Sequence, residues 1–448
     1  MSSLLCLGRH TVTGLLTTSG QQFVDWSAAY KLFSRDRLPI GHIFSVIRHA
    51  VLAELPPQAP LCVAIDDSLL RKSGTRIPGV AWRRDPLGPR FQTNFVRAQR
   101  FLQISASVPL AEHAHRMIPI CFSHAPTPDK PPVKADEQTR KQYRQAARQA
   151  RLSLLASQHI TSLRQHLDVE PNGQQRRLIV TADGGFTNET TLKDLPDRTS
   201  FIGRIRKDAK LNFLPEISAA PPHAGRPRRY GEVAPTPDDL RADDSVAWTP
   251  IDISLNGATH SLHIKHLPKL LWRNAGLKHT LQLIVIAPLG YRLRKGAKLL
   301  YKKPAFLICT DPDLDLATVL LHYLQRWDIE VNFREEKTLL GVGQAQVRNA
   351  NSVEDLPAFQ VASYAMLLLA TLRAFRGSDK ADSLPRPKWQ DAAPRFSTAR
   401  AINQLRAEVW RNALGLSNFS DFATQLPADT KPEKFIPDLR SAVLYAAN

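Results

Sequence analysis

Cysteine is scarce in this chain of 448 residues, and its four cysteines are widely separated. A zinc module or a disulfide framework needs closely spaced cysteines, so the sequence indicates neither of them. We expect the cysteines to be buried free thiols. His113 and His115 stand close together, but no further ligand motif lies nearby to complete a metal site.

Long apolar runs are also missing, since none approaches the roughly 20 residues of a membrane-spanning helix. The first residues, MSSLLCLGRHTVTG, lack the basic and then apolar pattern of a signal peptide with a cleavage site. We therefore expect a soluble intracellular protein that does not act in a membrane.

Acidic residues are outnumbered, with 41 Asp and Glu against 60 Lys and Arg, which gives a formal net charge of +19. Such a basic chain favours a polyanionic partner such as nucleic acid, although charge alone would also fit an anionic membrane. A hydrophobic content of 43% allows a large core and two or three structural units.

Several apolar runs predict strands, and two of them end in aspartate. LCVAI (61–65) stops at Asp66-Asp67-Ser68, and LIVTA (178–182) stops at Asp183. Unbroken apolar runs of this length are typical of strands that are covered on both faces. Further strands are predicted at 101–110, 201–206, 281–288 and 305–310.

Helical spacing of apolar residues predicts short helices in residues 1–58, where no helix-turn-helix pattern is specific enough to establish DNA binding. Residues 136–166 are expected to form one long helix whose many basic residues make a solvated face, with a DNA-contacting stripe as the alternative. Residues 354–376 are predicted as a buried helix, and one more helix is expected around 398–414.

Residues 317–340 predict a helix with an unusual polar stripe. At about 100° per residue, Tyr323, Arg326, Glu330 and Lys337 share a stripe about 60° wide, with Arg334 just beside it. Arginine, lysine and a tyrosine hydroxyl suit phosphate, whereas a carboxylate among them suits a metal ion or a proton transfer. An exposed helix with ion pairs at four-residue spacing is the alternative explanation.

The other residues of this helix are expected to follow the usual division into a polar face and core residues. A second polar face, opposite the stripe, is predicted to carry Gln325, Asp328, Asn332 and Glu336. Trp327, next to the stripe, is expected to lie in the core.

Asp66, Asp183 and Glu330 together predict a metal site. Ligands of open α/β sheets gather at the carboxyl ends of strands, where the two aspartates are expected. Three converging carboxylates repel one another unless cations compensate, and hard oxygen ligands favour Mg²⁺ or Mn²⁺. Each aspartate alone would more often be a turn-forming residue.

These motifs resemble a known family. The spacing Tyr323-x2-Arg326-x3-Glu330-x6-Lys337 looks like the YREK signature of bacterial insertion-sequence transposases in the insertion-sequence-four group of the DDE superfamily. IDDS around Asp66 resembles the first-acid motif of that group, and VTADGGF resembles the second. The resemblance covers residues 61 to 343.

The resemblance implies an α/β fold with an RNase H-like mixed-sheet catalytic core. It divides the chain into an N-terminal helical region, two parts of the core, a mainly β insertion and a C-terminal linker and helical region, with a hairpin expected at Asn256-Gly257 in the insertion. These parts are, in chain order, residues 1–58, 59–203, 204–280, 281–376 and 377–448, of which the second and fourth form the core.

The resemblance also implies the chemistry of a DNA transposase. Asp66, Asp183 and Glu330 would hold two Mg²⁺ ions, with Mn²⁺ as a substitute, for cleavage at transposon ends and attack of the freed 3′-OH on target DNA. Asp67 is the alternative first acid. The DNA-binding residues implied on the helix are Tyr323, Arg326, Arg334 and Lys337.

The implied partner is double-stranded DNA, both transposon ends and target. A homodimer is expected on DNA because two ends must be cut in one complex, and the expected location is the bacterial cytoplasm, with the nucleoid. An RNase H-like nuclease or recombinase that never integrates DNA is one alternative. A non-catalytic DNA-binding protein derived from a transposase is the other.

Overall fold

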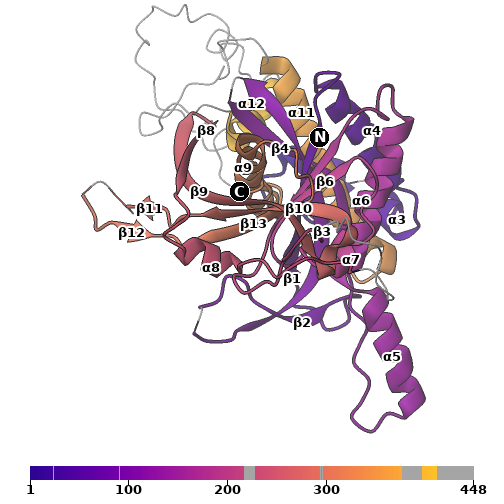
Figure 1. Ribbon diagram of the computed structural model, residues 1–448. Helices are drawn as coiled ribbons and strands as arrows, with labels where there is room; N and C mark the ends of the chain where they lie inside the picture. The colour runs from indigo at the N-terminus through magenta and orange to yellow at the C-terminus, as the bar shows by residue number, and fades with distance from the viewer. Residues whose placement is uncertain are drawn as a thin grey trace, which may run out of the picture. The chain divides into compact units, whose positions relative to one another are not determined.

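The structure is a computed structural model that describes residues 1–23, 25–89, 91–111, 113–215, 228–292, 294, 296–375 and 396–410 (Figure 1). Within these residues it is a mixed α/β fold, with a mixed sheet of 11 strands and a separate two-stranded ribbon. The predicted fold class is confirmed, and the architecture is consistent with an RNase H-like core.

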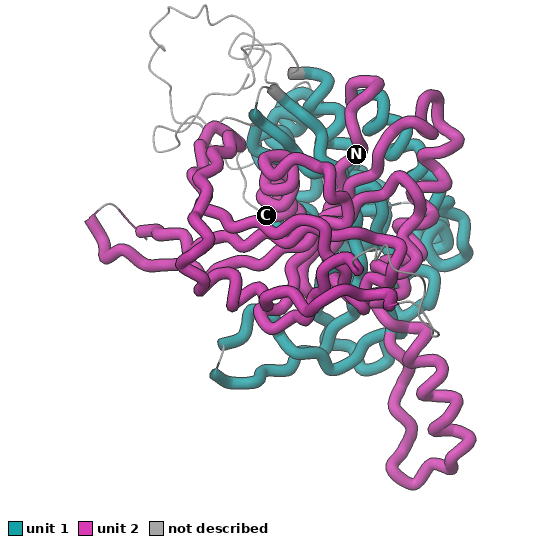
Figure 2. Tube along the Cα trace, in the orientation of Figure 1, with its two compact units in different colours: residues 1–54, 67–126, 330–448 teal, residues 55–66, 127–329 magenta. Residues whose placement is uncertain are grey.

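The chain divides into two compact units, which Figure 2 colours separately. Unit 1 comprises residues 1–54, 67–126 and 330–448, and unit 2 comprises residues 55–66 and 127–329. Two of the boundaries fall inside continuous elements. Strand β1 (Leu61–Arg71) passes from unit 2 to unit 1 after Asp66, and helix α10 (Asp328–Thr338) does so after Ile329.

Unit 2 is built on parallel and antiparallel strands in the order β1-β5-β6-β13-β10-β9-β7, with β8 paired to β9. Only β1, β5 and β6 are mutually parallel, and the others pair antiparallel. Most of these strands match the predicted ones. The bounds are β5 (Leu178–Ala182), β6 (Thr199–Arg204), β7 (Asn212–Phe213), β8 (Thr249–Leu255), β9 (Ala258–Trp272), β10 (Gly276–Ile286) and β13 (Ala305–Cys309).

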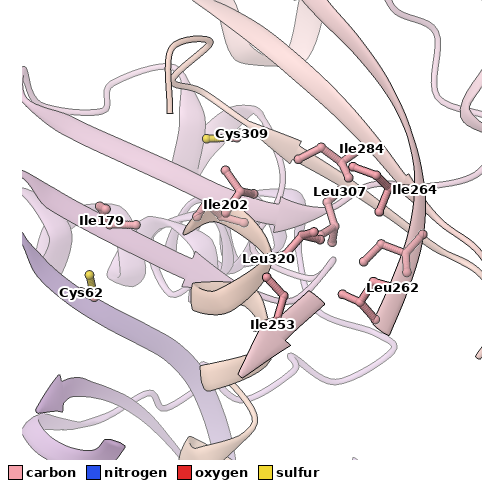
Figure 3. Close-up of a cluster of buried hydrophobic side chains, with 12 residues drawn as sticks. Cys62, Ile179, Ile202, Ile253, Leu262, Ile264, Ile284, Leu307, Cys309 and Leu320 are labelled. Atoms are coloured by element: carbon pink, nitrogen blue, oxygen red, sulfur yellow. The ribbon is translucent and has the colours of Figure 1, made fainter. Parts of the chain in front are cut away.

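The core of unit 2 lies between this sheet and helix α9 (Leu316–Gln325), as Figure 3 shows for part of it. Val319 and Leu320 of the helix pack on buried side chains from seven strands. Asp315 is the N-cap of α9, and its carboxylate accepts a hydrogen bond of 2.9 Å from the Thr318 N–H. The strand residues of the cluster are Cys62, Ile179, Ile202, Ile253, Leu262, Ile264, Ile284, Ile286, Leu307 and Cys309.

The predicted hairpin is confirmed. Leu255 pairs with Ala258, so that Asn256 and Gly257 alone form the turn between β8 and β9. Both have positive φ, 51° and 78°, as a type I′ turn requires. The strands predicted as an insertion, β7 to β9, extend the same sheet.

The remaining elements of unit 2 lie outside the large sheet. They are α5 (Glu137–Gln149), α6 (Leu152–Val169), α7 (Glu189–Leu192), α8 (Pro237–Ala242), η2 (Arg273–Ala275) and the ribbon of β11 (Gly290–Tyr291) and β12 (Leu300–Tyr301). The prediction of one helix over residues 136–166 was wrong, because the chain breaks between α5 and α6. Arg164 on α6 is also buried, and it donates to the carbonyls of Arg176 and Gly173 at 2.7 and 2.6 Å.

Unit 1 combines helices from both ends of the chain with strands from its middle. The predicted N-terminal and C-terminal helices are confirmed where they are described, while residues 377–395 and 411–448 lie outside the described residues. The bounds are α1 (Ser2–Leu5), α2 (Val12–Thr18), η1 (Gln21–Phe23), α3 (Ser27–Ser34), α4 (Ile40–Ala53), β2 (Ala81–Arg84), β3 (Phe95–Ala111), β4 (Ala114–His124), α11 (Ala350–Phe375) and α12 (Thr398–Trp410).

Helix α11 is the central helix of unit 1 and contacts α3, α4 and β4. By length and composition it could cross a membrane, which corrects the expectation that no segment approaches this length. Its most apolar window is 78% buried, as in the core helix of a folded domain.

Candidate active site

Two of the predicted acids are neighbours on adjacent strands of unit 2. Strands β1 and β5 are parallel, and Ile65 is in register with Ala182. The next residues in that register are Asp66 and Asp183. Adjacent strands lie about 4.8 Å apart, and matched positions in a parallel pair point to the same face. Asp66 and Asp183 therefore occupy neighbouring positions. Asp183 directly follows β5, whereas Asp66 lies within β1, which continues to Arg71, so the prediction that this strand stops at Asp66 was wrong.

The loop after β5 holds Asp183 in place. Its Oδ1 accepts a hydrogen bond of 2.8 Å from the Gly185 N–H, and its backbone carbonyl accepts one of 2.9 Å from the Thr187 hydroxyl. Gly203 on the neighbouring strand β6 makes room for Thr187, because a Cβ at this position would lie 2.2 Å from the Thr187 hydroxyl oxygen. The position of Asp183 thus depends on a glycine 20 residues further along the chain.

Arg326 provides positive charge beside the first acid. Its Nη1 lies 3.4 Å from Oδ2 of Asp66, and the two side chains are only 10% and 17% exposed. An ion pair with so little solvent is weakly screened, so the guanidinium offsets part of the carboxylate charge. This contact joins a residue of the predicted stripe to a predicted metal ligand.

The helix carrying the stripe is not continuous, which corrects the sequence analysis. α9 ends at Gln325, α10 begins at Asp328, and Arg326 and Trp327 form a turn between them. The Trp327 N–H bonds to the Leu324 carbonyl, and the Ile329 N–H bonds to that of Arg326. These three-residue spacings tighten the helix locally, so the predicted angles do not carry through the turn.

Trp327 in this turn and Tyr323 before it also differ from the predictions in how far their side chains are buried. Trp327 is 61% exposed and does not lie in the core. Tyr323 on α9 is half-buried, and its ring packs against the apolar cluster of unit 2.

In unit 1, α10 carries Glu330, Arg334 and Lys337. Glu330 is half-buried, whereas Arg334 and Lys337 are exposed. Desolvation nevertheless lowers the pKa of the Lys337 ammonium, while Glu336 and Asp67 oppose the shift and Arg71 reinforces it. The helix ends at Thr338, and Gly341 follows with a left-handed φ of 58°.

The face of α10 predicted as a second polar surface is buried, which is a further correction. Glu336 is 2% exposed and accepts a hydrogen bond of 2.9 Å from the Gln103 amide. Asn332 is 1% exposed and donates to the Ser105 hydroxyl at 3.1 Å. Burial raises the pKa of the Glu336 carboxyl to about 8. Strand β3 therefore holds α10 through polar contacts.

Asp67, the alternative first acid, has a different environment from Asp66. Successive residues of a strand point to opposite faces, so of the two only Asp66 shares a face with Asp183. Asp67 interacts with two arginines that the sequence analysis did not single out, Arg83 and Arg100. Desolvation lowers the pKa of both guanidinium groups, and Asp67 opposes the shift. No pattern in the sequence marks these two arginines: β2 reads AWRR, and in β3 Arg100 stands three residues after Arg97.

A metal site of three side chains is not assembled within the part of the chain that the structure describes. No group of three or more His, Cys, Asp or Glu side chains there has the arrangement to hold an ion. Asp66 and Asp183 are a pair in unit 2, and Glu330 belongs to unit 1.

Comparison with known families decides the class of protein. A family model described as "DDE superfamily endonuclease" matches residues 2–260, which is more than half of the chain. The chain belongs to this family. No curated protein matches the sequence significantly.

Membership in the DDE superfamily endonucleases confirms the predicted relationship to the DDE superfamily and places the chain among transposase-like nucleases, with DNA as the class of substrate. The insertion-sequence-four group and its YREK signature stay predictions. The matched range contains Asp66 and Asp183 and ends before Glu330. Asp66 and Asp183 are thus inside the segment that the family model matches. Glu330 and the other residues of the predicted helical stripe lie outside it, and only the chemistry of their side chains makes them candidates.

Proposed function

We propose that this DDE endonuclease is a DNA transposase that cleaves phosphodiester bonds at transposon ends and transfers the freed strand into target DNA. The observation that carries the proposal is the parallel register of β1 and β5, which brings Asp66 and Asp183 together. Arg326 beside Asp66 adds a cation at the same position.

The residues fit a divalent metal. Neighbouring carboxylates repel each other, and Mg²⁺ or Mn²⁺ prefers hard oxygen donors of this kind. We propose that Asp66, Asp183 and Glu330 hold two such ions. When bound, two ions supply activation of the attacking oxygen and stabilisation of the leaving oxygen in phosphodiester displacement.

The cationic residues around this segment are proposed to position the DNA. Arg326 is held in place by its contact with Asp66, and a guanidinium can make paired hydrogen bonds to a phosphate. Arg334 and Lys337 are exposed, so they can contact the phosphate backbone of the DNA. The Tyr323 hydroxyl is proposed as a further phosphate contact, with its ring anchored on the core.

The assembly is proposed to be a homodimer on DNA in the cytoplasm of a bacterium. Cutting two ends in one complex needs two active sites, and one protomer has one set of acids. The partner DNA is proposed to include both the ends of the element and the target.

The test uses Asp183→Asn and Glu330→Gln in the full chain, with Asp243→Asn as a control. The Asp243 carboxylate is exposed and accepts hydrogen bonds from the N–H and hydroxyl of the nearby Ser245. Cleavage is measured with Mg²⁺ on a duplex carrying the inverted repeats that flank the gene. DNA binding is followed by electrophoretic mobility shift, and Mn²⁺ binding by electron paramagnetic resonance.

We expect both site variants to lose cleavage and Mn²⁺ affinity while they retain DNA binding, and the control to behave like the wild type. Unchanged cleavage in either site variant refutes the assignment of that acid. Cleavage without strand transfer in the wild type supports the nuclease alternative, and DNA binding without cleavage supports the non-catalytic one.

A further inference from the structure

Helix α5 has no explanation in the packing of unit 2. None of its 13 residues is buried. In Figures 1 and 2 it extends away from the rest of the unit, at the end of an arm. Asp136 starts the helix by accepting a hydrogen bond of 2.6 Å from the Thr139 N–H. Since α5 adds nothing to the core, its role must lie at its surface.

That surface is strongly cationic along one sector. Arg140, Arg144 and Arg148 follow one another at four-residue spacing, and Lys141 lies beside them. All four are exposed. At about 100° per residue they occupy a sector about 100° wide. The half-buried residues of the helix lie on a different sector and are Tyr143, Ala146 and Ala147.

The arrangement is unfavourable for the isolated helix. Like charges at four-residue spacing destabilise a helix, and here the two pairs Arg140/Arg144 and Arg144/Arg148 are adjacent. The one acidic residue on α5 is Glu137, which pairs with Arg144. A helix of this length is marginally stable alone. A polyanion along the arginine column would remove the repulsion and stabilise α5.

We propose that α5 is a docking arm that binds the phosphate backbone of double-stranded DNA outside the candidate active site. Four residues of helix rise about 6 Å, so the arginines can reach successive backbone groups. Guanidinium groups suit phosphate, and the chain carries a net charge of +19. The inference rests on the proposed action on DNA.

An anionic membrane is the less suitable partner. A helix that lies in a membrane interface needs large apolar side chains opposite its charges. The sector of α5 outside the cations carries alanines, glutamines, one threonine and a single tyrosine. This composition gives little apolar surface to insert between lipids, whereas backbone contact with DNA needs none.

The test compares two full-length variants that each lose three positive charges. The arm variant carries Arg140→Gln, Arg144→Gln and Arg148→Gln. The control variant carries Lys193→Gln, Arg198→Gln and Lys278→Gln, three exposed cations that are already paired with carboxylates. Affinity for a 40-base-pair duplex without the element's ends is measured by fluorescence anisotropy over a series of salt concentrations.

Each lost phosphate contact lowers the slope of log K against log salt by about 0.9, so the arm variant is expected to lose about 2.7. We also expect slower hydrogen exchange in residues 137–149 when DNA is added. The control is expected to keep the wild-type slope.

An arm variant with the wild-type slope overturns the proposal, as does a control that loses as much. Loss of binding to phosphatidylserine vesicles with no change in DNA binding assigns the arm to membranes instead and also overturns it. None of these measurements uses cleavage. A changed slope in a protein that never cleaves DNA leaves the arm established and refutes the transposase proposal.

Discussion

Glu336 provides a quantitative test of how α10 is held in unit 1. Its carboxyl is 2% exposed and accepts a hydrogen bond from the Gln103 amide. Burial raises its pKa from 4.5 to about 8, opposed by the Gln103 hydrogen bond and by Lys337. The folded protein therefore keeps this proton at neutral pH. Glu336→Gln preserves the shape and the acceptor oxygen but removes the titration.

The sign of the effect follows from proton binding. Between pH 4.5 and about 8, the unfolded chain releases this proton and the folded chain retains it. The free energy of unfolding of the wild type must therefore fall as the pH rises through this window. Relative to acid pH, the rise in the pKa of Glu336 from 4.5 to about 8 lowers the free energy of unfolding by about 5 kcal/mol above pH 8 and by about 3 kcal/mol at pH 7. Residue 336 of the Glu336→Gln variant does not titrate, so the free energy of unfolding of the variant does not fall for this reason.

The assay is urea denaturation of the full chain at pH 5, 6, 7 and 8, with amide hydrogen exchange in α11 to report on unit 1. We expect Glu336→Gln to gain stability over the wild type as the pH rises, by about 3 kcal/mol at pH 7. Glu408→Gln, at an exposed carboxyl on α12, is the matched control and should follow the wild type. Stability curves for Glu336→Gln and the wild type that stay parallel from pH 5 to 8 would refute the reasoning.

Three further predictions concern the candidate active site. Asp66→Asn should abolish metal-dependent cleavage and Asp67→Asn should retain it, because only Asp66 shares a face with Asp183; the reverse result in a cleavage assay assigns Asp67 as the first acid. Gly203→Ala should destabilise the fold by about 1–3 kcal/mol through overpacking and reduce cleavage by displacing Thr187, and normal melting and activity would contradict this. Lys337→Ala should weaken DNA binding and lower its salt slope by about 0.9, whereas an unchanged slope argues against a phosphate contact.

Local patterns in the sequence were enough for the elements that depend on neighbouring residues. The apolar runs 61–65 and 178–182 predicted β1 and β5 because a covered strand needs apolar side chains on both faces. Asn256-Gly257 predicted a tight hairpin because both residues accept positive φ. In the same way, the aspartates that follow the two apolar runs predicted neighbouring acids, although β1 continues past Asp66 to Arg71.

Helical periodicity was less informative, because it groups residues on a face without saying what covers that face. The sequence placed Asn332 and Glu336 together and assigned them to solvent. In the structure, Gln103 and Ser105, more than 200 residues earlier in the chain, supply their hydrogen-bond partners. A polar face can be buried when such partners are available.

The sequence by itself determined the apolar runs of the strands, the acids that follow these runs, the basic character of the chain and its resemblance to the DDE transposases. Tertiary structure alone decided the register that matches Asp66 with Asp183, the turn at Arg326 and Trp327 that interrupts the helix, and the burial of Glu336. The physical reason is the range of the interactions. Strand formation and capping are settled within a few residues, whereas register, burial and the pairing of charges depend on contacts between segments far apart in the chain.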